Sequence, residues 1–414
     1  MATALTVRGR LTPAGEPLDV VVEHGAITAV QPAAGGPAVG DAGCLLGEAF
    51  FDLQVNGFAG VDFNRPAVTS GELRRAVTAM QRHGVARFLV TIITAPLPHM
   101  EATLSALARA RDEDPALAYA IPGVHLEGPF LAPEDGPRGA HPAAAILDPD
   151  WEVVRRLQDA GRGLIRMVTL APERPGAIGL IWQLRQAGIV VGIGHTDASD
   201  RDIDLAVEAG AQLSTHLGNG AHAMLPRHRN YIQKQLAADG LMASLICDGH
   251  HLPDYVVRNI VRCKTPERVI LVTDAMAAAA APPGEYRLGQ VVTEVGPDGY
   301  VRLPGTPYLA GSALTMDRAV ENAARFAGLP LHVAIGLAGC QPRRLFPDLR
   351  TGIAPGQPAD LVVIRPGPPL AVLATVVRGE VAYRADDSLQ AGASCPESSE
   401  PSLAGSQRRP APRP

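Results

Sequence analysis

Eight short apolar segments recur between residues 50 and 273, and they constrain the fold of this chain more than any other feature. Each has the length and the apolar content of a buried strand, and most are followed by a stretch of helical periodicity. Eight parallel strands with intervening helices are what a closed (β/α)₈ barrel requires. We therefore predict barrel strands over Phe50–Val55, Arg87–Ile93, Ala120–Leu126, Leu164–Leu170, Ile189–Gly194, Ala211–Thr215, Met242–Cys247 and Arg268–Thr273.

The stretches between these segments predict the helices of the barrel. A doubly wound open sheet is the alternative architecture, but the loop Gln54-Val-Asn-Gly-Phe-Ala-Gly after the first strand fits its glycine-rich fingerprint poorly. The predicted helices are Gly71–His83, His99–Arg111, Trp151–Ala160, Ile178–Ala187, Tyr255–Cys263, Thr315–Phe326 and His332–Ala338.

Both ends of the chain predict a second unit made of strands. Residues 1–49 contain short strands with Gly/Pro turns, and residues 341–384 return to strand character after the last helices. We expect these two segments to form one small β-sandwich domain beside a catalytic barrel of residues 50–340. Residues 385–414 are rich in Ser, Pro, Ala, Gln and Gly, and this composition predicts a disordered tail.

Composition and charge argue against several function classes. The 414 residues are 46% hydrophobic, and the formal net charge of -5 is too mild to favour a nucleic acid or a membrane surface as the partner. Five dispersed cysteines without a Cys-x-x-Cys pair fit a reducing cytoplasm. The N-terminus shows no signal-peptide core, and no run approaches the roughly 20 apolar residues of a membrane span. The sequence thus predicts a cytoplasmic protein with a small-molecule partner.

Four titratable residues each follow the apolar core of one predicted strand. Glu127, His195 and His216 offer the carboxylate and the two imidazoles of a divalent-metal site, and Asp274 offers the general base that such a metal needs. Taken singly, the histidines are also ordinary loop residues, and Asp274 is also a plausible cap of the following helix. Barrel enzymes keep their chemistry at the carboxyl ends of the strands, so the shared position of the four favours a metal site.

Two neutral amides mark the end of the first predicted strand. Gln54 and Asn56 are two residues apart and so share one face of that strand. Two imidazoles in their place could bring in a second metal, whereas amides bind divalent transition metals weakly. The sequence therefore predicts a single metal ion.

Further polar residues lie at the expected open face of the barrel. His141 follows the third strand, and of the adjacent His250 and His251 only one is expected to face a pocket. Arg227 and Arg229 offer planar forks suited to a phosphate or a carboxylate, with plain surface solvation as the alternative.

The motifs of this chain, taken together, resemble those of the N-acetylglucosamine-6-phosphate deacetylase family in the amidohydrolase superfamily. They follow the family order from about residue 46 to residue 382. The matching stretches are Phe51-Asp-Leu-Gln-Val-Asn-Gly, His125-Leu-Glu-Gly-Pro-Phe, Gly194-His-Thr-Asp-Ala, Thr215-His-Leu-Gly-Asn, Asp248-Gly-His-His, Leu271-Val-Thr-Asp-Ala, Leu309-Ala-Gly-Ser-Ala-Leu-Thr-Met and Pro355-Gly-Gln-Pro-Ala-Asp-Leu-Val.

This resemblance implies a (β/α)₈ barrel with a small β-domain, commonly as a homodimer. It implies hydrolysis of the N-acetyl group of N-acetylglucosamine 6-phosphate, which gives glucosamine 6-phosphate and acetate. It also implies Glu127, His195 and His216 as metal ligands and Asp274 as the catalytic acid and base. The implied cofactor is one divalent ion, usually Zn²⁺, with Fe²⁺ or another divalent ion as the alternative.

The resemblance also implies a set of substrate contacts, with Arg227 and His251 at the sugar phosphate and with His141 and Asn219 elsewhere on the substrate. Two segments depart from the family pattern near the expected phosphate site. Asn219-Gly-Ala-His-Ala-Met carries inserted residues, and Arg227-His-Arg-Asn-Tyr stands in place of Arg-Glu-Pro-Gly.

Several functions therefore stay open at this point. One is deacetylation of another N-acetylated sugar, with or without a phosphate, and another is a non-catalytic sugar-binding relic. The complete set of Glu127, His195, His216 and Asp274 speaks against the relic. Hydrolysis of a cyclic amide typically uses two metals bridged by a carboxylated lysine, and the end of the fourth strand, Thr169-Leu-Ala-Pro-Glu, has no lysine.

Overall fold

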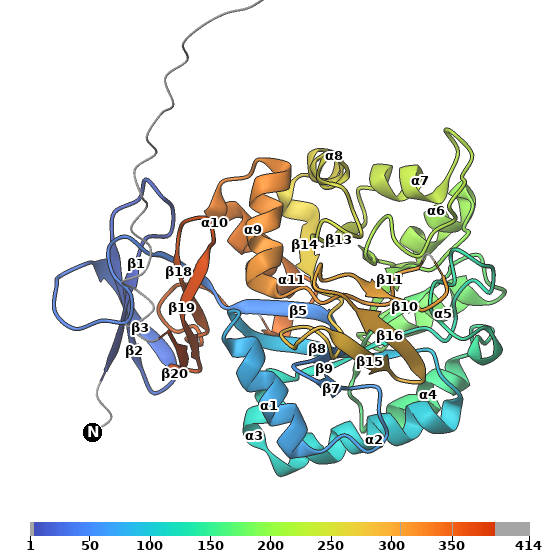
Figure 1. The fold of residues 1–414 in the computed structure, drawn as a ribbon, viewed down its shortest axis with the longest axis horizontal. Coiled ribbons are helices and arrows are strands. Elements are labelled where there is room, and N and C mark those ends of the chain that lie inside the picture. Colours follow the sequence, from blue (N-terminus) through green and yellow to red (C-terminus); the bar gives the residue numbers. More distant parts are fainter. Residues whose placement is uncertain (1–3, 307, 350, 386–414) are drawn as a thin grey trace, which may run out of the picture. The chain divides into compact units, whose positions relative to one another are not determined.

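The computed structural model describes residues 4–306, 308–349 and 351–385, and eight parallel strands form its centre (Figure 1). Each strand pairs with the next one in the chain, so the order of the sheet follows the sequence. The predicted barrel with separate antiparallel sheets is confirmed. The strands are β5 (Phe50–Val55), β8 (Val85–Ile93), β9 (Gly123–Glu127), β10 (Ile165–Leu170), β11 (Val190–Ile193), β12 (Leu213–Ser214), β13 (Met242–Ile246) and β14 (Val269–Val272).

The first and last strands of this sheet meet at a seam held by a buried carboxylate. Asp52 of β5 accepts hydrogen bonds from the Thr273 hydroxyl at 2.6 Å and from the Thr273 backbone N–H at 3.2 Å. The backbone N–H of Asn56 donates to the carbonyl of Ala275 at 2.7 Å, which continues the contact. Burial raises the pKa of Asp52 to about 7, and the hydrogen bonds oppose that shift. The seam brings the end of β5 beside Asp274.

Helices surround the barrel, and their boundaries follow local sequence signals. Thr69 and Glu72 form a capping box at the start of α1, and the same device, Ser199 with Asp202, begins α6, which the periodicity did not predict. The α-helices are α1 (Ser70–Gln81), α2 (Leu97–Glu113), α3 (Pro115–Ala120), α4 (Trp151–Ala160), α5 (Ala177–Gln186), α6 (Asp200–Ala209), α7 (Tyr231–Ala237), α8 (Asp254–Lys264), α9 (Met316–Ala327), α10 (Leu331–Ala338) and α11 (Cys340–Arg343). Short 3₁₀ turns are η1 (Ala143–Ala145), η2 (Pro266–Arg268) and η3 (Pro347–Leu349).

The expected start of the third barrel strand at Ala120 is wrong. Asp114 caps a short helix, with Pro115 as its first residue, and this helix runs through Ala120. Proline is preorganised for the first helical turn, so the apolar run divides into a helix and a strand.

Two antiparallel sheets combine the N-terminal and C-terminal segments. One contains β1 (Leu5–Gly9), β2 (Leu18–Glu23) and β3 (Ala26–Pro32), and the other contains β4 (Leu45–Glu48), β18 (Leu361–Arg365), β19 (Ala371–Val377) and β20 (Glu380–Arg384). Their apolar side chains share a core: Val7, Val20, Val22, Ile27, Val39, Cys44, Leu46, Ala359, Leu361, Val363, Ala374 and Val376. The domain boundaries at residues 50 and 341 stay predictions, and α11 packs against β5 and β14 of the barrel.

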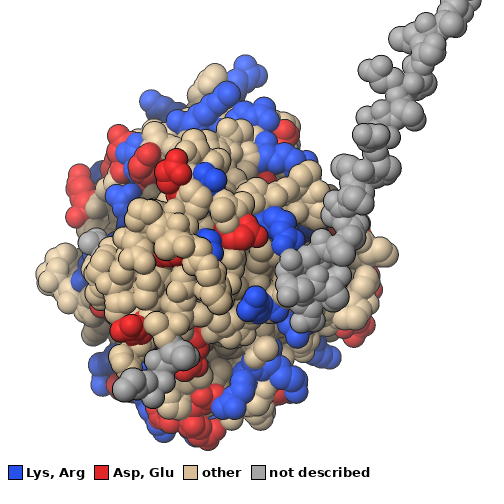
Figure 2. Space-filling model, turned by 90° about the vertical axis from the view of Figure 1, so that its left-hand side faces the viewer, with Lys and Arg blue, Asp and Glu red and all other residues tan. Residues whose placement is uncertain are grey.

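A small three-stranded sheet follows the last barrel strand, and it contains β15 (Gly284–Leu288), β16 (Val291–Val295) and β17 (Val301–Arg302). A two-stranded ribbon of β6 (Gly57–Phe58) and β7 (Val61–Asp62) follows the first. Of the expected tail, residues 386–414 lie outside the described part of the chain. Within that described part, none of the helices has both the length and the apolar character that a membrane crossing requires. On the face seen in Figure 2, basic and acidic side chains are interspersed over a largely uncharged surface.

Candidate active site

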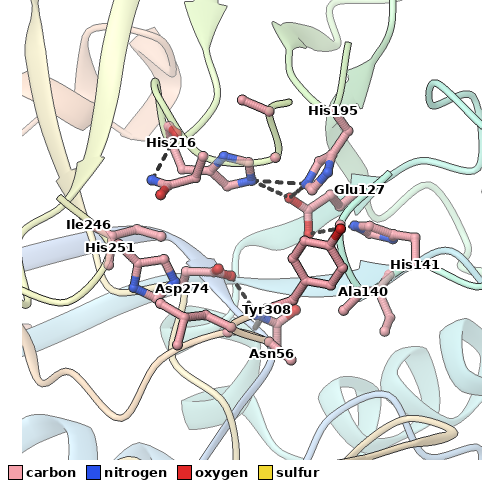
Figure 3. A pocket seen from close by; sticks show the side chains of 18 of the residues that line it. Asn56, Glu127, Ala140, His141, His195, His216, Ile246, His251, Asp274 and Tyr308 are labelled. Atoms are coloured by element: carbon pink, nitrogen blue, oxygen red, sulfur yellow. Dashed lines mark hydrogen bonds and ion pairs between the residues drawn. The ribbon is translucent and has the colours of Figure 1, made fainter. Parts of the chain in front are cut away.

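A cavity of about 260 Å³ opens at the carboxyl ends of the barrel strands. Most of the residues singled out from the sequence meet there, although they come from distant parts of the chain (Figure 3). The cavity is lined by eight of them: Asn56, Glu127, His141, His195, His216, Asn219, His251 and Asp274. Gln54 lies behind this lining and contacts Glu127, whereas Arg227 is exposed and does not line the cavity.

Three of the non-glycine residues that line the cavity have a left-handed backbone, which such residues rarely adopt. The φ angle is 51° at His195, 30° at His216 and 50° at Asp274. Hydrogen bonds fix these turns, since the His216 N–H donates to the Ser244 hydroxyl at 2.7 Å and the Asp274 carbonyl accepts from the Ser312 N–H at 2.9 Å. Such conformations cost of order 1–3 kcal/mol each and cluster at functional sites. The backbone therefore turns sharply where each strand ends.

Three ligand-type atoms converge on one point of the cavity. The Oε1 atom of Glu127 lies 3.0 Å from His216 Nε2 and 3.3 Å from His195 Nε2. The two Nε2 atoms are 3.1 Å apart. Zinc–ligand bonds of 2.0–2.1 Å at tetrahedral angles require a separation of about 3.3 Å between donors. The three atoms thus have nearly the spacing that a bound divalent ion imposes, and the residues fit such an ion.

The protonation of His195 also suits a ligand. Its Nδ1 lies 2.8 Å from the carbonyl oxygen of Pro137, which can only accept a hydrogen bond. With a metal bound, the single proton of the neutral ring would therefore be on Nδ1, and the Nε2 lone pair would face the cavity. A hydrogen bond at the remote nitrogen is the usual way in which proteins orient a metal-binding histidine.

His141 offers a second possible ligand set. One ligand atom from each of Glu127, His141 and His195 lies within 4.8 Å of the other two. However, His141 Nε2 is 3.9 Å from the nearest Glu127 oxygen, whereas His216 Nε2 is at 3.0 Å from Glu127. Burial and the neighbouring His195 lower the pKa of His141 to about 3, so its ring is neutral. The tighter spacing favours His216 over His141 as the third ligand beside Glu127 and His195.

Glu127 is held as an anion at the centre of this group. The Nε2 amide of Gln54 donates to Glu127 Oε1 at 2.8 Å. Burial alone would raise the pKa of Glu127, but hydrogen bonds and charge from His195 and His216 keep that pKa well below its ordinary value. The carboxylate is thus ready to bind a cation without first losing a proton.

Asp274 points into the same cavity and has an environment that favours its protonated form (Figure 3). Burial, and then the negative charge of Glu127, raise the pKa of Asp274 to about 7. The Nδ2 amide of Asn56 donates to Asp274 Oδ1 at 2.7 Å, which leaves Oδ2 free for other partners. A carboxyl group with a pKa near neutrality can both accept and return a proton. The amides of Gln54 and Asn56 therefore each support one carboxylate.

Asp248 is a site residue that the sequence analysis did not single out. Its Oδ2 lies 2.6 Å from His251 Nδ1, and its Oδ1 accepts the backbone N–H groups of His250 and His251 at 2.8 Å each. Burial opposes ionisation, but the hydrogen bonds and the charge of His251 hold the pKa of Asp248 below its ordinary value. The spacing Asp248-Gly-His-His, typical of a turn closed by an aspartate side chain, was the available signal. Asp248 orients the His251 ring towards the cavity.

The loop after β12 holds the remaining expected contacts. The side-chain amide of Asn219 donates to the His216 carbonyl at 3.1 Å, so Asn219 is tied to one of the possible metal ligands. Gly220 follows with φ 56°, and a side chain there would collide with the His195 ring at 2.7 Å. Gly220 thus allows the loop to pack on His195, while Arg227, farther along, is exposed.

The chain is similar along most of its length to known sugar-phosphate deacetylases. The Bos taurus N-acetylglucosamine-6-phosphate deacetylase is 34% identical over 360 residues, which cover 84% of this chain and 85% of the relative. The Escherichia coli O157:H7 N-acetylgalactosamine-6-phosphate deacetylase is 32% identical over 372 residues, which cover 89% of this chain and 96% of the relative. No protein-family model matches the chain.

A solved structure shows the same architecture. It is a mutant of the Mycobacterium smegmatis N-acetyl-D-glucosamine-6-phosphate deacetylase in complex with N-acetyl-D-glucosamine-6-phosphate. The similarity has a TM-score of 0.83 at 33% identity and covers 92% of this chain and 100% of the other. The Glu/His cluster at the strand ends can hold a metal ion. Together, the barrel and this cluster define a hydrolase of the amidohydrolase superfamily. Within that superfamily, the chain belongs to the N-acetylglucosamine-6-phosphate deacetylase family.

Proposed function

We propose that this protein hydrolyses the N-acetyl amide of N-acetylglucosamine 6-phosphate and releases glucosamine 6-phosphate and acetate. One observation supports this proposal above the others. The Nε2 atoms of His195 and His216 converge on Glu127 in the cavity into which the Asp274 carboxyl points. A ligand cluster beside a proton acceptor is what metal-assisted amide hydrolysis needs.

We assign the metal to Glu127, His195 and His216. Three protein ligands would leave room for water or substrate on the ion, as in catalytic rather than structural zinc sites. A divalent ion bound there supplies Lewis acidity, which lowers the pKa of water towards neutrality and polarises a carbonyl group. Zn²⁺ suits this mixture of imidazole and carboxylate ligands, and Fe²⁺ is the alternative.

The protein side chains provide the proton transfers. Asp274 accepts a proton from the attacking water as the water oxygen adds to the acetyl carbonyl carbon. It then gives this proton to the amide nitrogen as the C–N bond breaks, so the amine leaves as a neutral group. Asn56 holds one Asp274 oxygen in place, and the neutral ring of His141 can donate a hydrogen bond to the substrate.

We expect one tightly held metal ion per chain. Gln54 and Asn56 donate their amide N–H groups to Glu127 and Asp274. Their remaining amide oxygens are weak ligands for divalent transition metals, so a second ion is not expected. Elemental analysis of the purified protein after exhaustive dialysis should return close to one divalent ion per chain. Two tightly held ions per chain would contradict the assignment.

A substrate panel tests the proposed function. The purified enzyme should be given the 6-phosphates of N-acetylglucosamine and N-acetylgalactosamine, because known relatives bear both sugar names. The two unphosphorylated sugars complete the panel, and acetate release is the readout. We expect the highest kcat/KM with N-acetylglucosamine 6-phosphate. If none of the four sugars yields acetate while the metal is in place, the proposal fails.

Arg227 is the cation that we propose for the 6-phosphate, although it is exposed outside the cavity in this structure. Loss of a charge-assisted hydrogen bond of about 1.5–3 kcal/mol should raise KM for the phosphorylated sugar by about 10- to 150-fold in Arg227→Ala. KM for the unphosphorylated sugar should stay constant. Arg201→Ala provides the control, since Arg201 is exposed in α6 and does not line the cavity. Equal KM values in Arg227→Ala and the wild type would remove Arg227 from the site.

We also propose a homodimer that works in the cytoplasm, as the family resemblance implies. The described cysteines Cys44, Cys247, Cys263 and Cys340 are free thiols, which agrees with a reducing compartment. Light scattering from the purified protein should give about twice the chain mass of 43.3 kDa. A mass equal to one chain would argue against the dimer.

A further inference from the structure

One aromatic side chain on the cavity wall has no part in the chemistry described above. Tyr308 lines the cavity and is 40% exposed, so its ring is accessible to a ligand. Among the described residues that line the cavity, it is the only Phe, Tyr or Trp. Figure 3 shows its ring extending into the cavity, on which Glu127 and Asp274 also border.

The backbone around Tyr308 is fixed at both ends. On one side, its carbonyl accepts the Leu303 N–H at 3.0 Å, and the Ala310 N–H donates to Val301 of β17 at 3.3 Å. On the other side, Ser312 donates to the Asp274 carbonyl at 2.9 Å. The segment that bears the ring is therefore attached to the backbone of the proposed acid and base. With the backbone held in this way, only the two side-chain torsions of Tyr308 have to be ordered when a ligand binds.

The surroundings of Tyr308 divide the cavity into two kinds of wall. Leu309 and Ala310 follow it in the chain, and Leu288 and Ile93 add further apolar surface to the lining. The polar groups of the cavity come from the histidines and carboxylates at the strand ends. A pyranose ring has the same division, because its two faces carry C–H groups and its edge carries hydroxyl and amide groups.

We propose that Tyr308 is the stacking platform for the pyranose ring and thereby a determinant of sugar specificity. The C–H face of the sugar packs on the aromatic ring, whose face has a negative potential. The acetamido edge then points towards Glu127, His195 and Asp274. This inference rests on the proposed deacetylation and adds the residue that selects a ring-shaped substrate.

Three substitutions test this role with N-acetylglucosamine 6-phosphate. Tyr308→Ala removes the ring, Tyr308→Leu keeps apolar bulk without a flat aromatic face, and Tyr308→Phe keeps the ring without the hydroxyl. A stacking contact should raise KM by about 2- to 12-fold in the Ala and Leu variants and change kcat by less than about 2-fold. Tyr308→Phe should stay within about 2-fold of the wild type. Tyr255→Ala is the control, since Tyr255 is 58% exposed and does not line the cavity.

A binding measurement separates this inference from the proposed function. Calorimetry with the same sugar phosphate on an Asp274→Asn background should show the same 2- to 12-fold increase in Kd for Tyr308→Ala. If the wild type releases no acetate, the proposed function fails, whatever the Kd values are. If the wild type is active but Tyr308→Ala keeps its KM and Kd, only the stacking role fails. A loss in Tyr308→Phe equal to that in Tyr308→Ala would also overturn it, because the hydroxyl would then be the contact.

Discussion

Replacing Asp274 with asparagine should reduce kcat by roughly 10²–10⁴-fold, the range that a positioned acid or base contributes. The amide keeps the shape of the side chain but cannot take the proton from water or return it to the amine. The metal should stay near wild-type occupancy, because Glu127, His195 and His216 hold it. Steady-state kinetics together with elemental analysis check both parts of this expectation.

The alternative role of Asp274 predicts a different result. Asparagine is about as good a helix cap as aspartate, so a purely structural Asp274 would tolerate the change. The control is Asp197→Asn, which makes the same acid-to-amide change. Asp197 lies in the loop after β11 and does not line the cavity. An Asp274→Asn variant within about threefold of wild-type turnover would remove Asp274 from the mechanism.

Replacing His216 with alanine should remove the metal and the activity together. The variant retains only two protein ligands. Loss of a residue that merely hydrogen-bonds to a ligand typically lowers metal affinity by roughly 10- to 100-fold, and loss of a ligand itself should lower it further. His141→Ala should instead keep the metal and lose part of its activity, because the spacing around Glu127 favours His216 as the ligand. Metal content and turnover measured on the same samples separate the two histidines.

The control for this pair is His228→Ala, since His228 is exposed in the loop that precedes α7. It should keep both metal and activity. The reverse pattern, in which His141→Ala loses the ion and His216→Ala keeps it, would assign the ligand set to Glu127, His141 and His195 instead.

The barrel was predictable because strand periodicity and length are local properties of the chain. All eight predicted barrel strands are present, and their ends place Glu127, His195, His216 and Asp274 around one cavity. The boundary at Ala120 was wrong because a capped proline turned the start of an apolar run into a helix. The type of residue at a strand end thus indicated where the active site lies. The exact start and end of each strand depended on the turn residues beside it.

The contacts within the site were not predictable, because they join residues that are distant in sequence. Asn56 and Asp274 are 218 positions apart, and their hydrogen bond depends on how the seam between β5 and β14 closes. The sequence placed Gln54 and Asn56 on one strand face, but only the fold shows which carboxylate each supports. Likewise, Tyr308 follows a segment of short strands, and its position over the cavity depends on how that segment packs.

Arg227 illustrates the opposite case. Its residue type suits a phosphate, and the resemblance assigns it to one, but the loop after β12 leaves it exposed away from the cavity lining. The position of a loop residue depends on how the loop folds, so the motif alone could not predict where the guanidinium lies. Its role remains a prediction that depends on the kinetic test above.

The most direct test of the account is the origin of the oxygen in the released acetate. The purified enzyme, with its metal content measured, is given N-acetylglucosamine 6-phosphate in water enriched in oxygen-18. Hydrolysis predicts one amine for each acetate and one labelled oxygen in each acetate, because the water oxygen adds to the acetyl carbon. Acetate without the label, or no acetate from the metal-loaded enzyme, would contradict the assignment of this protein as a hydrolytic deacetylase.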